Sequence, residues 1–136
     1  MARILLTWEL GGGLGHVAPL SLLARELLSR GHKVCAAVRN PTLASEHFDS
    51  RVPVLQAPVT AVRPGHTIEP MRSFAHVLYN TGFDDLGGLR ARVFSWRAIF
   101  DAAVPDLILA DHSPTVLLLA HALSRPIATI GTGFCH

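Results

Sequence analysis

Short apolar runs recur along the chain and alternate with segments of helical spacing. Residues 3–8 (RILLTW) and 33–38 (KVCAAV) are almost continuously apolar, which is typical of strands buried on both faces of a parallel sheet. Between them, residues 20–28 carry leucine or alanine at i, i+3, i+4, i+7 and i+8, and Gly31 supplies a C-terminal stop. The pattern predicts a β-α-β unit with a right-handed crossover.

Three further apolar runs predict strands at 52–58, 105–111 and 125–131. A short helix is predicted over 43–48, and a longer one over 113–124. With another helix before the fourth strand, the order becomes β-α-β-α-β-α-β-α-β. This order predicts an α/β fold, namely a doubly wound, mostly parallel, Rossmann-like sheet of about five strands with helices on both faces.

The helix before the fourth strand is predicted to begin with Asp84 as its N-cap. Its apolar side chains recur at helical spacing and should face the core: Leu86, Leu89, Val93, Trp96 and Phe100. Its charged side chains are predicted to point elsewhere: Arg90, Arg92, Arg97 and Asp101. The helix after the fourth strand has a specific start signal, with Ser113 as the predicted cap and Pro114 at the first helical position.

The pattern lapses between residues 59 and 82. Glycine and proline interrupt this stretch at Pro64, Gly65, Pro70 and Gly82. We predict a long loop here, with one or two helical turns around residues 71–79. Loops of this length in a compact domain are usually functional or mobile.

Composition narrows the classes of protein that remain. The chain has 136 residues, of which 49% are apolar, enough for one ordinary core and one domain. No apolar run approaches the roughly 20 residues that cross a bilayer, and the N-terminus lacks the apolar region of a secretory signal. We therefore expect a cytoplasmic chain that is not transmembrane. The net charge is +2 with scattered arginines, which argues against a nucleic-acid partner.

Residues 11–20 (GGGLGHVAPL) are the first candidate for chemistry, because they follow the first predicted strand directly. In an open parallel sheet, ligands bind at the carboxyl ends of the strands, and a glycine-rich turn before a helix can hold a phosphate. The spacing satisfies G-x-G-x-x-A through Gly13, Gly15 and Ala18. However, the second strand ends in Arg39 and Asn40 and not in the acidic residue that binds the ribose of NAD. Of the dinucleotide sites, only one for NADP therefore remains compatible with the sequence.

The competing hypothesis centres on His16, at the start of the predicted helix. The helix dipole favours the neutral imidazole, which can accept a proton from a hydroxyl. Asp111 ends the fourth strand at the same sheet edge, and in the order 3-2-1-4-5 it could hydrogen-bond to His16 and orient it. Either residue could instead serve as a helix cap. No metal is expected, because no close set of histidine, cysteine or acidic ligands is present.

Three stretches resemble the N-terminal, acceptor-side part of nucleotide-sugar-dependent glycosyltransferases of the GT-B fold: LLTWELGGGLGHVAPLSLLARELLSRGHKV, PDLILADHSP and RPIATIGTG. The likeness is greatest to bacterial macrolide, flavonoid and rhamnosyl transferases. It implies inverting transfer of a hexose from a nucleotide-diphosphate sugar, as co-substrate without a further cofactor, to the hydroxyl of a small-molecule or lipid acceptor. It also implies that His16 is the catalytic base and that Asp111 supports it. Further substrate-binding residues would be Gly12, Gly13 and Gly15 in the turn, and Met71, Phe74, Tyr79 and Phe83 as walls of the acceptor pocket.

The resemblance covers residues 1–136 as a single acceptor-side domain, whereas the family's donor-binding motifs lie in a second domain. We therefore expect a truncated chain, either a fragment or one subunit of a split enzyme whose donor domain is a separate chain. Alone it should be inactive, because nothing would hold the sugar nucleotide opposite His16. An NADP-binding oxidoreductase domain and a non-catalytic fragment or binding subunit are the alternatives.

Overall fold

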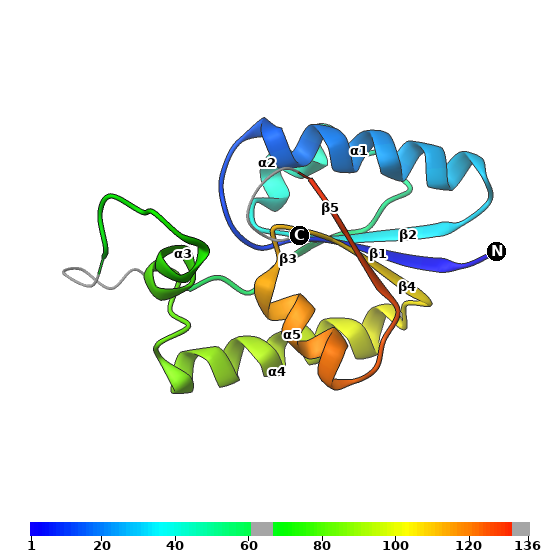
Figure 1. Cartoon of the computed structure of the whole chain (residues 1–136). Coiled ribbons are helices and arrows are strands. Elements are labelled where there is room, and N and C mark those ends of the chain that lie inside the picture. Colours follow the sequence, from blue (N-terminus) through cyan, green and yellow to red (C-terminus); the bar gives the residue numbers. More distant parts are fainter. Residues whose placement is uncertain (61–66, 132–136) are drawn as a thin grey trace.

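The computed structural model describes residues 1–60 and 67–131 and contains an all-parallel sheet of five strands in the order β3-β2-β1-β4-β5 (Figure 1). The strands are β1 (Arg3–Trp8), β2 (Lys33–Val38), β3 (Val54–Gln56), β4 (Leu107–Asp111) and β5 (Ile127–Ile130). The helices are α1 (Leu14–Ser29), α2 (Pro41–Ser45), α3 (Phe74–Asn80), α4 (Leu86–Ala103) and α5 (Pro114–Ala122). The predicted α/β class and strand order are confirmed.

Helices cover both faces of the sheet, α1 and α2 on one side and α4 and α5 on the other (Figure 1). Successive residues of a strand point to opposite faces, so Leu6 and Trp8 pack with α1 while Leu5 packs with α4 and α5. This explains why the strands are continuously apolar. Among the described residues, no helix has both the length and the apolar character needed to cross a membrane.

The end of α1 has the predicted glycine stop. Gly31 has a φ of +80°, in the region that favours glycine. Its N–H donates to the carbonyl of Leu28 (3.0 Å), and the N–H of His32 donates to that of Leu27 (3.1 Å). This is the Schellman arrangement, and it turns the chain directly into β2.

Three predictions about α4 are wrong. The N-cap position belongs to Asp85, not Asp84, and Asp85 makes no side-chain cap bond. Arg92, predicted to point away from the core, is buried, and its Nη2 donates to the carbonyl of Gly82 (2.9 Å). Leu86, predicted to face the core, is 61% exposed. The physical reason is that the start of α4 extends past the sheet (Figure 1), so its first turns pack against the preceding segment instead of the strands.

The predicted loop at 59–82 contains the helix α3, which lies beyond the carboxyl ends of the strands (Figure 1). Ser73 caps this helix by accepting from the N–H of His76 (3.4 Å). The side chain of Asn80 pairs with both backbone groups of Ile68, at 2.7 and 3.0 Å. Pro64 and Gly65 of the predicted loop lie outside the described residues.

Candidate active site

The glycine-rich turn joins the end of β1 to α1 at the carboxyl edge of the sheet. Gly11 and Gly13 have φ values of +83° and +81°, which favour glycine over any residue with a Cβ atom. The N–H of Leu10 donates to the carbonyl of His112 (3.0 Å), which ties the turn to the end of β4. The helix then begins at Leu14, so His16 lies in its first turn, as predicted.

His16 and Asp111 are in direct contact, with 3.0 Å between the imidazole Nδ1 and the carboxylate Oδ2. The sheet brings them together because β1 and β4 are neighbours and Trp8 pairs with Asp111 in the parallel register. The side chain of Asp111 is 5% exposed and that of His16 is 18% exposed. A carboxylate only accepts hydrogen bonds, so the contact places the imidazole hydrogen on Nδ1 and leaves the lone pair on Nε2.

Two glycines leave the space that this pair occupies. A Cβ atom on Gly11 would lie 2.6 Å from Nε2 of His16, and one on Gly131 would lie 2.6 Å from Oδ1 of Asp111. Gly131 follows β5 directly and has a φ of +103°. Sequence reasoning gave neither glycine a specific role. The role of Gly131 could have been predicted from its position, because it is a glycine immediately after a strand at the ligand-binding edge of the sheet.

Two aromatic rings hold the imidazole of His16. The Trp8 ring is stacked on it, with 5.2 Å between centroids and 19° between planes. His112 approaches edge-on, at 5.8 Å and 89°. Burial, and secondarily the neighbouring His16, lower the pKa of His112, and its Nε2 is buried without a hydrogen-bond partner among the described residues. Sequence reasoning assigned neither ring to the site.

Glu9 caps α5 from the end of β1. Its buried carboxylate accepts from the backbone N–H of Thr115 (2.9 Å) and from the Thr115 hydroxyl. Ser113 occupies the N-cap position, but the prediction that its side chain caps the helix is wrong. The hydroxyl of Ser113 instead donates to the carbonyl of Asp111 (2.9 Å) and accepts from Thr7 (3.1 Å). Burial raises the pKa of Glu9, and the Thr115 hydrogen bonds oppose that rise.

The other glycines of the turn face open space. A Cβ atom on Gly12, Gly13 or Gly15 would meet no atom within 4 Å. A polar cavity of about 320 Å³ separates the turn from the end of β2, and its lining includes Gly12, Gly13, Arg39, Asn40, Thr42 and Gln56. Within the described residues, no three histidine, cysteine or acidic side chains converge as metal ligands would.

The three predicted aromatic walls lie on or after α3. Phe74 and Tyr79 are half-buried residues of α3. The Cζ atom of Arg92 lies over the ring of Phe83, 5.5 Å from the ring centroid. In the described part of the chain, the rings that contact His16 are those of Trp8 and His112. The structure therefore does not bring the three onto the imidazole, and their role as pocket walls stays a prediction.

Neither a family model nor a curated protein matches the sequence. Solved structures do match. The glycosyltransferase of kitacinnamycin is 24% identical with a TM-score of 0.61, over 94% of this chain and 30% of that one. UGT2 of Phytolacca americana, complexed with UDP-2-fluoro-glucose and pterostilbene, is 20% identical with a TM-score of 0.63, over 97% and 31%. MurG of Acinetobacter baumannii is 19% identical with a TM-score of 0.62, over 93% and 34%.

These matches define the class of fold. The chain has the Rossmann-like architecture of one half of a GT-B glycosyltransferase, which confirms the predicted resemblance in fold. It spans about a third of the length of the solved structures that it matches.

Proposed function

We propose that this chain is the acceptor-binding half of an inverting glycosyltransferase and that His16 is its catalytic base. One observation carries the proposal: Asp111 holds Nδ1 of His16 at 3.0 Å, at the carboxyl edge of the sheet. The contact leaves Nε2 as the basic nitrogen, on the side of the glycine turn. The glycosyltransferases among the similar structures support the same reading.

The reaction is a direct displacement. Nε2 of His16 takes the proton of the acceptor hydroxyl while the hydroxyl oxygen forms a bond to the anomeric carbon of the sugar. The bond from that carbon to the diphosphate oxygen breaks, and the nucleoside diphosphate leaves with the electron pair on the opposite face. The anomeric configuration inverts. Asp111 stabilises the imidazolium that forms, and a positioned base of this kind contributes about 10²- to 10⁴-fold in rate.

The proposed reaction has two substrates, a sugar donor and a hydroxyl-bearing acceptor. The donor is a nucleotide-diphosphate hexose, which the complex of the Phytolacca americana protein with UDP-2-fluoro-glucose supports. The acceptor is a small molecule or a lipid that carries a hydroxyl. The open backbone at Gly12, Gly13 and Gly15 leaves room for the acceptor and the diphosphate near the start of α1. A donor-binding domain, in the same or a separate chain, holds the sugar, and without it we expect no turnover.

The base assignment is tested by His16→Ala in the chain combined with a donor-binding domain. We expect turnover to fall by about 10²- to 10⁴-fold, and Asp111→Asn to lower it as well because the amide no longer selects the same tautomer. His121→Ala, at an exposed position on α5, is the matched control and should keep turnover and melting temperature. Near-normal turnover in a folded His16→Ala variant would remove the base assignment.

A second candidate function, NADP binding, is favoured by the polar cavity beside the turn. Arg39 and Asn40 line it together with Gly12 and Gly13, which is where a 2′-phosphate would be expected. Titration with NADPH, followed by its fluorescence, tests this candidate. Micromolar binding that Arg39→Ala abolishes would establish it, whereas no binding at high micromolar cofactor would leave it without support.

A further inference from the structure

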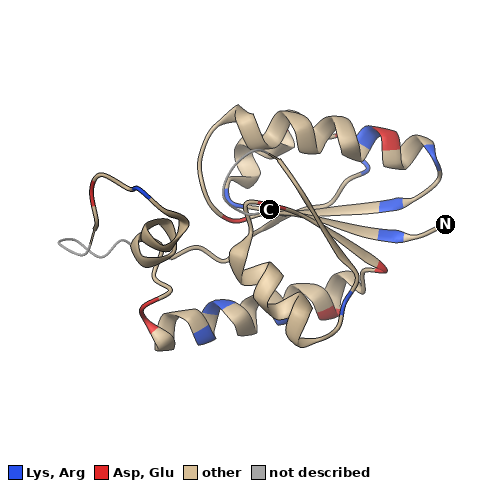
Figure 2. Cartoon of the chain, in the orientation of Figure 1, with Lys and Arg blue, Asp and Glu red and all other residues tan. Residues whose placement is uncertain are grey.

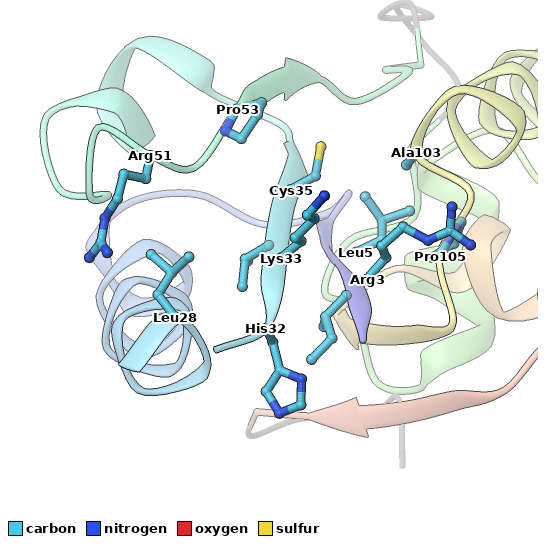
Figure 3. Close-up of a pocket in the computed structure, with 12 residues that line it drawn as sticks. Arg3, Leu5, Leu28, His32, Lys33, Cys35, Arg51, Pro53, Ala103 and Pro105 are labelled. Atoms are coloured by element: carbon cyan, nitrogen blue, oxygen red, sulfur yellow. The ribbon is translucent and has the colours of Figure 1, made fainter. Parts of the chain in front are cut away.

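A second cavity, of about 330 Å³, opens at the amino ends of β1 and β2, at the end of the strands opposite to His16. Figure 3 shows Leu28 and Arg51 on one side of it, Ala103 and Pro105 on the other, and β2 between them. Its lining is mainly apolar and is divided by β2: Leu5, Ala103 and Pro105 lie on the α4 side, whereas Leu28 and Val34 lie on the α1 side. The volume lies at the lower end of the range for small-molecule sites.

The mouth of this cavity is basic. Arg3 and Lys33 lie directly opposite one another in the β1–β2 register, and Arg51 also lines the cavity. Figure 2 shows the two basic positions side by side at the starts of these strands. Arg3 pairs with Asp106 at 3.4 Å and Arg51 with Asp49 at 2.8 Å.

Lys33 is the cation at this mouth that keeps its charge unpaired. It makes no ion pair in the described part of the chain, and none of the lining residues carries a carboxylate. Like charges on adjacent strands repel one another, so a bound anion would relieve the repulsion between Lys33 and Arg3.

The strand register grades the cavity from charged to apolar. Side chains two residues apart share a face of the sheet, so Leu5 and Cys35 form the row behind Arg3 and Lys33. Cys35 is half-buried, and burial raises the pKa of its thiol. Leu5 is fully buried, so a ligand that enters from the basic mouth meets the neutral thiol of Cys35 one row further in.

We infer that this cavity binds a single-chain alkyl carboxylate on the α4 side of β2, with its carboxylate at Lys33 and its alkyl chain against the apolar lining of that side. A fully polar ligand would place polar groups against the apolar lining without hydrogen-bond partners. A neutral hydrocarbon would leave the basic residues at the mouth without a counter-charge. His32 adds a donor at the mouth: its Nδ1 accepts from the N–H of Ala2 (3.2 Å), which leaves the hydrogen on Nε2. This site is independent of the glycosyl transfer proposed above.

Thiol labelling tests the proposal in the full chain, because Cys35 lines the cavity. In a Cys135→Ser background Cys35 is the only cysteine, and its rate of modification by a maleimide reports access to the cavity. We expect dodecanoate, below its micelle-forming concentration, to slow the modification in a saturable manner. Dodecyltrimethylammonium, with the same chain and the opposite charge, should not. Equal protection by the two amphiphiles, or protection by neither, would overturn the proposal.

The role of the basic mouth is tested by Lys33→Glu. We expect the dodecanoate concentration for half-protection to rise about tenfold or more, because a charge-assisted contact is replaced by repulsion. Arg90→Glu makes the same change of charge at an exposed position near the start of α4, the opposite end of that helix from Ala103, and should leave protection unchanged. Unaltered protection in Lys33→Glu would refute the placement of the carboxylate.

Discussion

His16 is a candidate base because of the residues that surround it, and each of its ring nitrogens has a different neighbour. Asp111 accepts from Nδ1, whereas Nε2 faces the space that Gly11 leaves free. Trp8 and His112 restrain the ring itself. Because a base must present one nitrogen in one direction, the contacts that fix the tautomer and the ring plane matter as much as the imidazole.

Gly131→Ala tests the fit around Asp111. The added Cβ would lie 2.6 Å from Oδ1, at a φ of +103° that alanine rarely adopts, so we expect the carboxylate to move and its hydrogen bond to His16 to weaken. Nitrogen NMR of the imidazole measures this as a change in tautomer population. Gly12→Ala is the control, since its Cβ would meet nothing within 4 Å. An unchanged imidazole spectrum in Gly131→Ala would contradict the assigned role.

His112 predicts a dependence of stability on pH. Its folded pKa is lowered by burial, so the unfolded chain, with a histidine pKa of about 6.5, binds the proton first as the pH falls. The free energy of unfolding should therefore decrease as the pH drops below about 6.5 and level off below the folded pKa. His112→Asn removes this contribution, and asparagine tolerates the φ of +44° at this position. Urea unfolding at about pH 8 and about pH 5.5 measures the difference, and an equal pH dependence in the variant would contradict it.

At the scale of elements, β1 and α5 are joined by a buried carboxylate. Glu9 belongs to the turn after β1, yet it accepts the N–H of Thr115 at the start of α5. The adjacent strands β1 and β4 bring the two together. The carboxyl ends of β1 and β4 also position the turn before His16 and the carboxylate of Asp111. The cap of α5 and the candidate site therefore depend on the same pair of strands.

Glu9→Ala should lower the free energy of unfolding by about 1–3 kcal/mol, because it leaves the buried N–H of Thr115 without its partner. Glu9→Gln should cost less, since the amide oxygen can still accept from that N–H and no charge is buried. Urea denaturation of the two variants measures the comparison. Equal destabilisation by alanine and glutamine would show that the negative charge, and not the hydrogen bond, is what α5 requires.

At the scale of the whole molecule, the sheet ends at β5. Within residues 1–60 and 67–131, β5 pairs with β4 alone, and Ala128 and Thr129 on it are exposed. An open edge with unpaired backbone groups can pair with another chain. The described chain therefore carries a surface that favours association.

We expect the 136-residue chain to associate in a concentration-dependent manner, measured by light scattering after size-exclusion chromatography. Thr129→Lys should reduce association, because a charge on an edge strand opposes strand pairing. Ser29→Lys adds the same charge at an exposed position at the end of α1 and serves as the control. A monomer at all concentrations would contradict this expectation.

The sequence alone determined the class of fold, and the usual strand order of that class agrees with the structure. Continuous apolar runs, helical spacing of apolar residues and stops such as Gly31 depend on local steric and solvent effects within each segment. The contact between His16 and Asp111 could also be predicted, because parallel strands deliver their carboxyl ends to a common edge. Tertiary structure decided the rest. The hydrogen bond from Thr7 to Ser113 and the cap that Glu9 supplies to α5 join groups that are 106 residues apart in the sequence. The burial of Arg92 depends on the way the segment before α4 folds back onto the helix. Local spacing carries no record of such partners, because a buried polar group pairs with whichever complementary atom the packed fold places beside it.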